Sequence, residues 1–137
     1  MINELNRNIK DAAKTVVTAL PAAGANVDST ALDLEQLVGG QLDGVQLELS
    51  VPAVAALVDT KLVTFSVKDG AASNSLAAID PAQSTTIVGV ATGAGSAAKV
   101  VRFRLPPNTR RYVSVNASVP ADAGTLTAVS FTVALLF

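Results

Sequence analysis

The densest group of chemically active side chains in this sequence lies between residues 99 and 112. Five basic residues fall within thirteen positions there, and no Asp or Glu occurs from residue 81 to residue 121. The rest of the 137-residue chain holds five bases and all eleven acids, which gives a formal net charge of -1. An uneven charge distribution of this kind suits oriented docking on an acidic partner. The predicted docking residues are Lys99, Arg102, Arg104, Arg110, Arg111 and Tyr112.

Two other interpretations of this basic segment are open at the sequence level. Nucleic-acid binding would require aromatic side chains interleaved with the Lys and Arg residues, so that nucleobases could stack on them. Tyr112 is the only outward-facing aromatic residue expected in the segment. The sequence pI of about 5.2 also opposes general attraction of polyanions, so we expect no direct nucleic-acid partner. The plainer alternative is a solvated strand face whose arginines pair with acids from elsewhere in the chain.

Catalytic and metal chemistry have few candidates in the composition. The chain contains no His and no Cys, which excludes Ser–His and Cys–His nucleophile systems and sites built on imidazole or thiolate. The acids are scattered singly, and several adjoin turn residues, where Asp ordinarily bonds the local backbone. Asp33 and Glu35 form the only alternate-position pair, a weak signal for calcium. We therefore predict no enzyme activity, no metal and no cofactor.

One glycine-rich stretch imitates a dinucleotide-binding motif. The letters "GAGSAA" at residues 93–98 match the GxGxxA pattern after a predicted strand. The fingerprint requires a helix next and an acid about 20 residues later. An alternating strand, "KVVRFRL", follows instead, and the next acid is Asp122. We interpret the stretch as a flexible connection between two strands.

Period-two hydrophobic patterning dominates the elements around these residues. Alternation of apolar and polar residues predicts half-buried antiparallel strands. The clearest segments are 45–51, 61–68, 99–105, 112–119 and 126–137, with weaker candidates at 15–19, 29–34 and 85–91. About eight short strands in one domain indicate an eight-stranded antiparallel jelly-roll sandwich. An immunoglobulin-like sandwich is the alternative, but its characteristic Cys and Trp residues are missing.

The jelly-roll prediction has a consequence for the basic segment. A hairpin of 99–105 with 112–119 would place Arg104 opposite Tyr112, close enough for a cation–π contact. As sixth and seventh strands of a jelly roll, these segments would instead lie in opposite sheets. We therefore predict that this contact is not made.

The N-terminal segment differs from the rest in its hydrophobic period. Apolar residues at three- and four-residue steps over 2–16 predict a short helix, either lying on its own domain or docking on a neighbouring subunit. The predicted organisation is an N-terminal helix or arm at 1–14 and a β-sandwich domain at 15–137. No secretory signal or membrane-spanning stretch is recognisable, so we expect a chain made in the cytoplasm with no membrane partner.

The order of these parts resembles a known family. A Thr/Ala-rich first strand leads to a "-DL-" strand in "AAKTVVTALPAAGANVDSTALDL", and "LDGVQLELSV" and "TKLVTFSVKDGAASN" follow. The most specific part is "VRFRLPPNTRRYVSVNASVPADAGTLTAVSFTVAL", in which Leu-Pro precedes an Arg-Tyr strand. Over residues 12–137, the chain is similar to the jelly-roll cement (decoration) proteins of tailed-bacteriophage heads, the type known from a Bordetella phage.

This resemblance implies a structural protein of the virion with no catalytic activity. Such a protein would be made in the host cytoplasm and bind the exterior of the assembled capsid. As a dimer or trimer at capsid symmetry axes, it would bridge neighbouring subunits of the major capsid protein. The alternative is a carbohydrate- or protein-binding β-sandwich module of a phage fibre or adhesin, although one Tyr and no Trp offer few sugar platforms. A hydrolase built on two carboxylates is a third possibility, because fold does not fix function.

Overall fold

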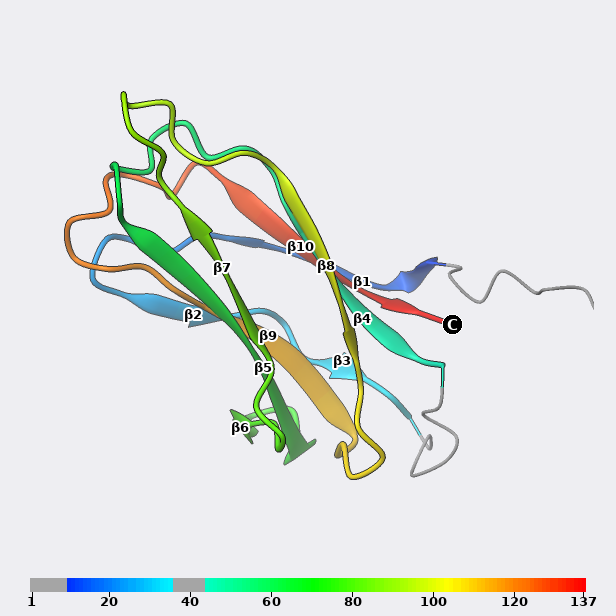
Figure 1. The fold of residues 1–137 in the computed structure, drawn as a ribbon. Coiled ribbons are helices and arrows are strands. Elements are labelled where there is room, and N and C mark those ends of the chain that lie inside the picture. Colours follow the sequence, from blue (N-terminus) through cyan, green and yellow to red (C-terminus); the bar gives the residue numbers. More distant parts are fainter. Residues whose placement is uncertain (1–9, 36–43) are drawn as a thin grey trace, which may run out of the picture.

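A computed structural model describes residues 10–35 and 44–137, and every regular element in these two ranges is a β-strand (Figure 1). The strands are β1 (Lys10–Ala19), β2 (Asn26–Asp28), β3 (Leu32–Asp33), β4 (Gln46–Val51), β5 (Leu62–Ala72), β6 (Ser75–Ala78), β7 (Ser84–Val88), β8 (Lys99–Arg104), β9 (Tyr112–Ser118) and β10 (Ser130–Leu136). No helix within the described ranges has the length and hydropathy needed to cross a membrane.

The strands form two antiparallel sheets with jelly-roll connectivity. One sheet has the order β1-β10-β4-β8, and the other has β2-β9-β5-β6, with β3 also paired to β9 and β7 also paired to β5. Strands β2 and β3 both pair with β9, and β6 and β7 both pair with β5. Each of these two pairs therefore counts as one interrupted strand, and the ten strands reduce to eight in chain order. Numbered in that way, the two sheets run 1-8-3-6 and 2-7-4-5. The predicted eight-stranded antiparallel jelly roll is therefore confirmed, with two of its strands each interrupted once.

Both interruptions have a local cause. Between β2 and β3, the Ser29 hydroxyl takes the place of a backbone acceptor and receives the Val115 N–H at 3.0 Å. Between β6 and β7, Pro81 has no backbone N–H to donate to the sheet. Regular pairing resumes after it, where the Val67 N–H donates to the Gln83 carbonyl at 2.9 Å.

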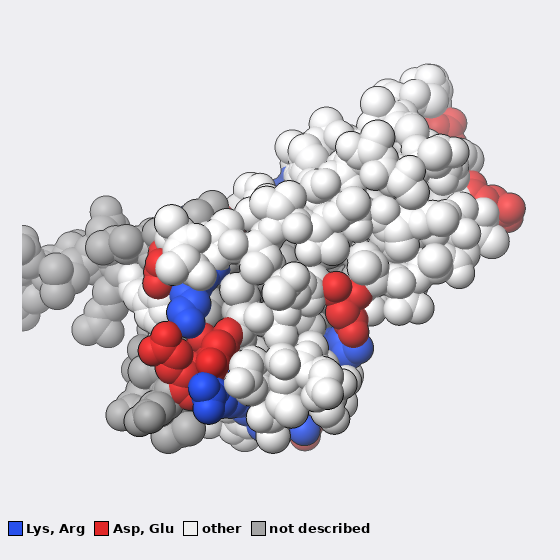
Figure 2. Space-filling model, turned by 180° about the vertical axis from the view of Figure 1, so that it is seen from behind, with Lys and Arg blue, Asp and Glu red and all other residues white. Residues whose placement is uncertain are grey.

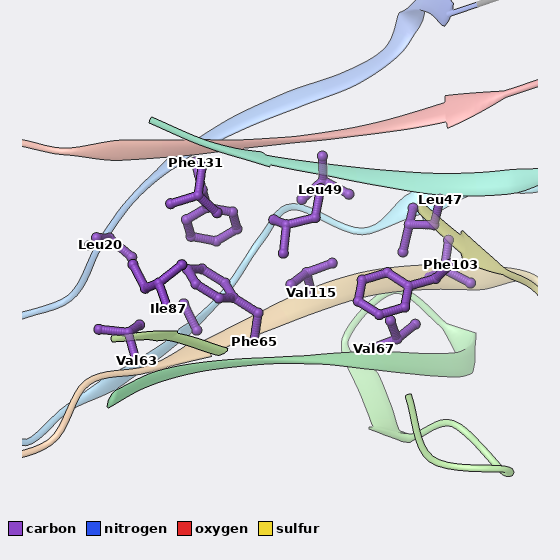
Figure 3. Packing of buried hydrophobic residues seen from close by; sticks show 14 of the residues in the cluster. Leu20, Leu47, Leu49, Val63, Phe65, Val67, Ile87, Phe103, Val115 and Phe131 are labelled. Carbon is purple, nitrogen blue, oxygen red and sulfur yellow. The ribbon is translucent and has the colours of Figure 1, made fainter. Parts of the chain in front are cut away.

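The core lies between the two sheets and follows the predicted alternation (Figure 3). On β5, Val63, Phe65 and Val67 are fully or almost fully buried, and Val115 of β9 lies beside them. Phe131 of β10 faces them from the other sheet, and its ring meets the Phe65 ring edge-on, with centroids 5.4 Å apart and planes at 69°. Edge-to-face packing of this kind adds to the stabilisation from buried area.

The N-terminal helix prediction is wrong where the structure can be compared with it. Residues 10–14, which the helix was expected to include, belong to β1, whose Lys10 pairs with Leu136 of β10. The register shifts between Lys10 and Thr15, so β1 is irregular there and its apolar residues need not follow the strand period of two. The rest of the predicted arm, residues 1–9, lies outside the described residues.

The prediction about Arg104 and Tyr112 is confirmed by the topology. Strand β8 pairs with β4 in the four-stranded sheet, where Arg104 is opposite Gln46. Strand β9 belongs to the other sheet, where Tyr112 is opposite Gly70 of β5 and Asp33 of β3. The two segments therefore form no hairpin.

Candidate functional site

The residues of the predicted docking surface are spread over both sheets rather than gathered on one face. Arg102 and Arg104 lie on β8 of the four-stranded sheet, whereas Tyr112 begins β9 of the other sheet. Arg110 and Arg111 lie in the connection between these strands. Figure 1 shows this β8–β9 connection at the lower end of the sandwich.

Arg110 is held by a buried carboxylate inside the same chain. Asp69, near the end of β5, has a side chain only 6% exposed, and its carboxylate receives the Arg110 backbone N–H at 2.8 Å. The guanidinium donates to the same carboxylate through Nη2 at 2.7 Å and Nε at 3.2 Å. It also donates to the Asp69 carbonyl at 2.8 Å. These contacts raise the pKa of Arg110 and fasten the β8–β9 connection to β5.

Arg111 forms a second fork with Asp33 of β3. Nε and Nη2 each donate to one carboxylate oxygen at 2.9 Å, and the Glu35 N–H also donates to Asp33 at 2.7 Å. The hydrogen bonds from Arg111 lower the pKa of Asp33 to about 2, and the same pairing raises the pKa of Arg111. The guanidinium also lies 5.3 Å from the Tyr112 ring centroid, and Lys14 pairs with Glu35 at 3.0 Å.

The remaining basic side chains of the segment are also engaged within the chain. Arg102 donates to Glu48 of β4 at 3.1 Å, and this carboxylate is only 9% exposed. Lys99 donates to the Thr86 carbonyl on β7 at 2.7 Å, which joins the neighbouring edges of the two sheets. Arg104 has an interaction partner as well.

In the folded chain, the arginines of the basic segment therefore lie beside acids from other parts of the sequence, and most of their charge is neutralised locally. The acids that pair with the arginines are Asp33, Glu48 and Asp69, and all three lie outside the acid-free stretch 81–121. An acidic partner would have to compete with these internal carboxylates for Arg102, Arg110 and Arg111. Docking through the basic residues stays a prediction, but the geometry favours a structural role for them.

A different surface lies at the opposite end of the sandwich. In Figure 2, positive and negative side chains lie side by side near one end of the molecule, whereas the other end is mostly white with some acidic side chains. We call this second end the loop end. It consists of the connections 52–61, 89–98 and 119–129, which meet at the upper left of Figure 1, and of the adjoining strand residues Leu62 and Val88. Its charged residues are Asp59, Lys61 and Asp122, and Lys61 pairs with Asp122 at 3.6 Å.

The loop end and the strands leading into it expose four apolar side chains. Val58, Leu62, Val88 and Val90 are 44%, 50%, 44% and 49% exposed. Leu62 of β5 and Val88 of β7 are direct register partners on the outer face of their sheet. Exposed apolar side chains that lie side by side are typical of contact surfaces for other proteins.

Close backbone packing holds the loop end in place. Val54 and Ser96 exchange two backbone hydrogen bonds of 3.0 Å, and Val58 donates to the Ala123 carbonyl at 3.0 Å. A side chain on Gly95 would fall well inside van der Waals contact with the Val54 carbonyl oxygen, so only glycine fits there. The three connections therefore form one packed unit.

The glycine-rich stretch that resembles a dinucleotide motif belongs to this unit. The Asp59 carboxylate receives the backbone N–H groups of Thr92 and Gly93 at 3.0 Å each, and the Val90 N–H donates to the Gly95 carbonyl at 2.8 Å. The stretch leads into strand β8 as predicted. The expectation that it is a loose connection is wrong, because these hydrogen bonds fix the turn. The residue that fixes the turn is Asp59, which sequence reasoning missed because it lies 33 residues before Thr92.

A polar hollow of about 270 Å³ lies on the outer face of the six-stranded sheet. Its lining residues are Asn26, Ser66, Lys68, Ala78, Asn116 and Ser118. At its edge, Asp28 receives hydrogen bonds from Lys68 at 2.8 Å and from Asn116 at 2.6 Å. Burial raises the pKa of Asp28, but these two hydrogen bonds outweigh it and lower the pKa below its ordinary value. Sequence alternation predicted which side chains on β5 and β9 face outward. It could not predict that side chains from β2, β5 and β9 lie next to one another, because that depends on strand pairing.

Metal binding finds no support in the part of the chain that the structure covers, since no three of its acidic side chains come together as ligands. No protein-family model matches the sequence, and no curated protein matches it. A solved structure described as "Family 16 Carbohydrate Binding Module-2" has a TM-score of 0.38 with 13% identity, over 88% of this chain and 85% of the other. A likeness this weak carries no argument about function.

Proposed function

We propose that this chain is a structural protein of a phage virion that binds the outer surface of the assembled capsid. It acts as a homo-oligomer, dimer or trimer, and bridges neighbouring subunits of the major capsid protein without catalysing a reaction. It is made in the host cytoplasm and resides on the virion exterior. The resemblance of residues 12–137 to jelly-roll cement proteins motivates the proposal, and the jelly-roll strand order is consistent with it.

The observation that carries the proposal is the packed loop end with its exposed apolar side chains. A surface that is already fixed loses little conformational entropy on docking, so more of the contact energy appears as affinity. The core of a protein interface is depleted in charged residues. The four exposed apolar side chains would form that core, and the paired Lys61 and Asp122 would lie at its rim. An oligomer would present several loop ends at once, so weak individual contacts would add up on a repetitive shell.

The proposed docking residues therefore shift from the basic segment to the loop end. Arg110 serves the fold through Asp69, so reversing its charge would perturb folding together with any binding. Val88 and Leu62 are better test positions because their side chains are half exposed.

The first experiment uses the tagged full chain as bait in a lysate of its native source, with the captured proteins identified by mass. A dominant, stoichiometric shell-forming protein is the expected result. Purified shells of that protein are then mixed with the chain and sedimented. Val88→Asp should reduce co-sedimentation at least tenfold, because it places a charge in a desolvated contact.

Val17→Asp is the matched control, since Val17 is 67% exposed but lies on β1 of the four-stranded sheet, whereas Val88 lies on β7 of the other sheet. Equal binding by both variants would refute docking through the loop end. Capture of glycans or of fibre components in place of a shell protein would refute the capsid role. That outcome would support the alternative, a binding module of a fibre or adhesin.

A further inference from the structure

The outer face of the six-stranded sheet carries a second feature that capsid docking does not use. The structure has one hollow of about 270 Å³ on this face and another of about 430 Å³ beside Asp28. Asp28 lines the larger hollow and receives hydrogen bonds from Lys68 and Asn116, which line the smaller one. The second hollow is lined by Asp28, Ser29, Thr30, Ala31, Ser73, Asn74 and Leu76. The larger hollow falls within the size range of sites for small organic ligands, roughly 300–1,000 Å³, and the smaller one lies just below it.

Three strands bring the polar groups of this face together. Asp28 of β2 pairs with Asn116 of β9, which pairs in turn with Ser66 of β5. Lys68 of β5 reaches across β9 to Asp28. Asn116 also lies 3.3 Å from the Asn26 side-chain oxygen, so one hydrogen-bond network fixes the side chains before any ligand arrives.

The network leaves donors and acceptors free toward the hollow. Within the described residues, the Ser66 and Ser118 hydroxyls have no partner in the chain, and each can both donate and accept. The Asn116 side-chain oxygen and the Asn26 amide nitrogen are not used by the network, which leaves one acceptor and one donor. A ligand that satisfied these groups would itself carry closely spaced donors and acceptors.

Charge balance narrows the chemical class of the ligand. Among the described residues that line the two hollows, only Lys68 and Asp28 are charged, and they neutralise each other at 2.8 Å. The site therefore offers no net attraction to phosphates, nucleic acids or cations. Its lining has only Ala31, Leu76 and Ala78 as apolar residues, so it does not suit a hydrophobic ligand either.

We infer that this face binds a neutral, polyhydroxylated ligand, that is, an uncharged saccharide. Each sugar hydroxyl can both donate and accept, which matches the mixed set of groups on Ser66, Ser118, Asn26 and Asn116. None of the described lining residues is aromatic, so we expect an affinity in the millimolar range. The inference goes beyond capsid docking, because its residues lie on β2, β5 and β9 rather than at the loop end.

The test uses the full-length, isotope-labelled chain titrated with neutral cello-, manno-, xylo- and N-acetylglucosamine oligosaccharides, and with acidic oligogalacturonate. The side-chain amide signals of Asn26 and Asn116 should shift with saturation for at least one neutral probe. The amide signal of Asn108, which donates to the Asp80 carbonyl in a distant loop, should not move. Asn116→Ala should weaken binding roughly tenfold, the loss expected from removing one hydrogen-bonding side chain, and Asn108→Ala should leave it unchanged.

Three results would overturn the inference: no response to any neutral probe at millimolar concentration, a response only to the acidic probe, or binding that Asn116→Ala does not weaken. If Asn116→Ala fails to fold, Ser118→Ala supplies the same comparison, because Ser118 is exposed and its side chain is not part of the hydrogen-bond network. Val88→Asp should bind saccharide normally. Failure of capsid docking and failure of saccharide binding are thus distinguishable.

Discussion

Two glycines of the loop end allow a direct measurement of how tightly it is packed. Gly93 and Gly95 lie two residues apart in the same turn, and both have left-handed backbones, with φ of +73° and +68°. A Cβ atom on Gly93 would meet nothing within 4 Å. On Gly95, it would clash with the Val54 carbonyl oxygen and lie 2.6 Å from the Ala55 Cα atom. The pair Gly93→Ala and Gly95→Ala therefore shares the backbone strain and differs in the clash.

The expected free-energy changes follow from these two contributions. Left-handed φ costs an alanine about 1–2 kcal/mol, so Gly93→Ala should lower the free energy of unfolding by that amount. Gly95→Ala carries the same cost and also forces the backbone of Val54 away from Ser96. That displacement weakens two backbone hydrogen bonds, each contributing about 1 kcal/mol. We expect a total loss of about 3–4 kcal/mol for Gly95→Ala.

Urea unfolding followed by far-ultraviolet circular dichroism measures both variants, because the chain has no Trp and only one Tyr as fluorescent reporters. Equal m-values for the variants and the wild type would show that the comparison concerns stability alone. A difference between the two variants below about 0.5 kcal/mol would refute the reasoning. The loop end would then accommodate the added methyl group with no further loss in the free energy of unfolding. Such a result would contradict the idea that the loop end is a tightly packed, preformed docking surface.

Two further predictions concern the internal ion pairs. Because pairing with Arg111 lowers the pKa of Asp33 to about 2, its contribution to stability is complete above the unfolded pKa of 3.8 and is lost as pH falls toward 2. Asp33→Asn should therefore lose less stability than wild type between pH 4 and pH 2 in urea titrations, and an unchanged acid limb would contradict this. Asp69→Ala should lower the free energy of unfolding by about 2–3 kcal/mol, because it removes a buried acceptor of charged hydrogen bonds. Asp122→Ala, whose side chain is 82% exposed, should change it by at most about 0.5 kcal/mol, so equal effects would oppose the structural role of Asp69.

Strand patterning predicted the fold well because alternation reports local burial. The segments 45–51, 61–68, 99–105 and 112–119 coincide with β4, β5, β8 and β9 to within a few residues at each end, and their apolar faces form the core. The short strand β6 was missed, since "SLAA" shows no clear alternation. The error at residues 10–14 has the same origin, because an irregularity in β1 breaks the period on which the prediction relied.

The candidate sites were less predictable, because each depends on residues far apart in the sequence. Arg110 and Asp69 are 41 residues apart, and Arg111 and Asp33 are 78 residues apart. No local sequence pattern predicts such pairs, so the acid-free stretch 81–121 was interpreted as an unpaired positive surface. The hollow beside Asp28 likewise needs Asn116 from 88 residues further along the chain.

The sequence by itself determined that this chain forms half-buried antiparallel strands, and that it has no His or Cys for catalysis or metal binding. These properties depend on side-chain type and on periodicity along neighbouring residues, both of which are local. Only the tertiary structure decided which strands are neighbours, and therefore which charges neutralise one another and which apolar side chains stay exposed. Coulombic and hydrogen-bond energies depend on distance in space rather than along the chain, so the surface that is free to bind a partner emerges only when the sheets are assembled.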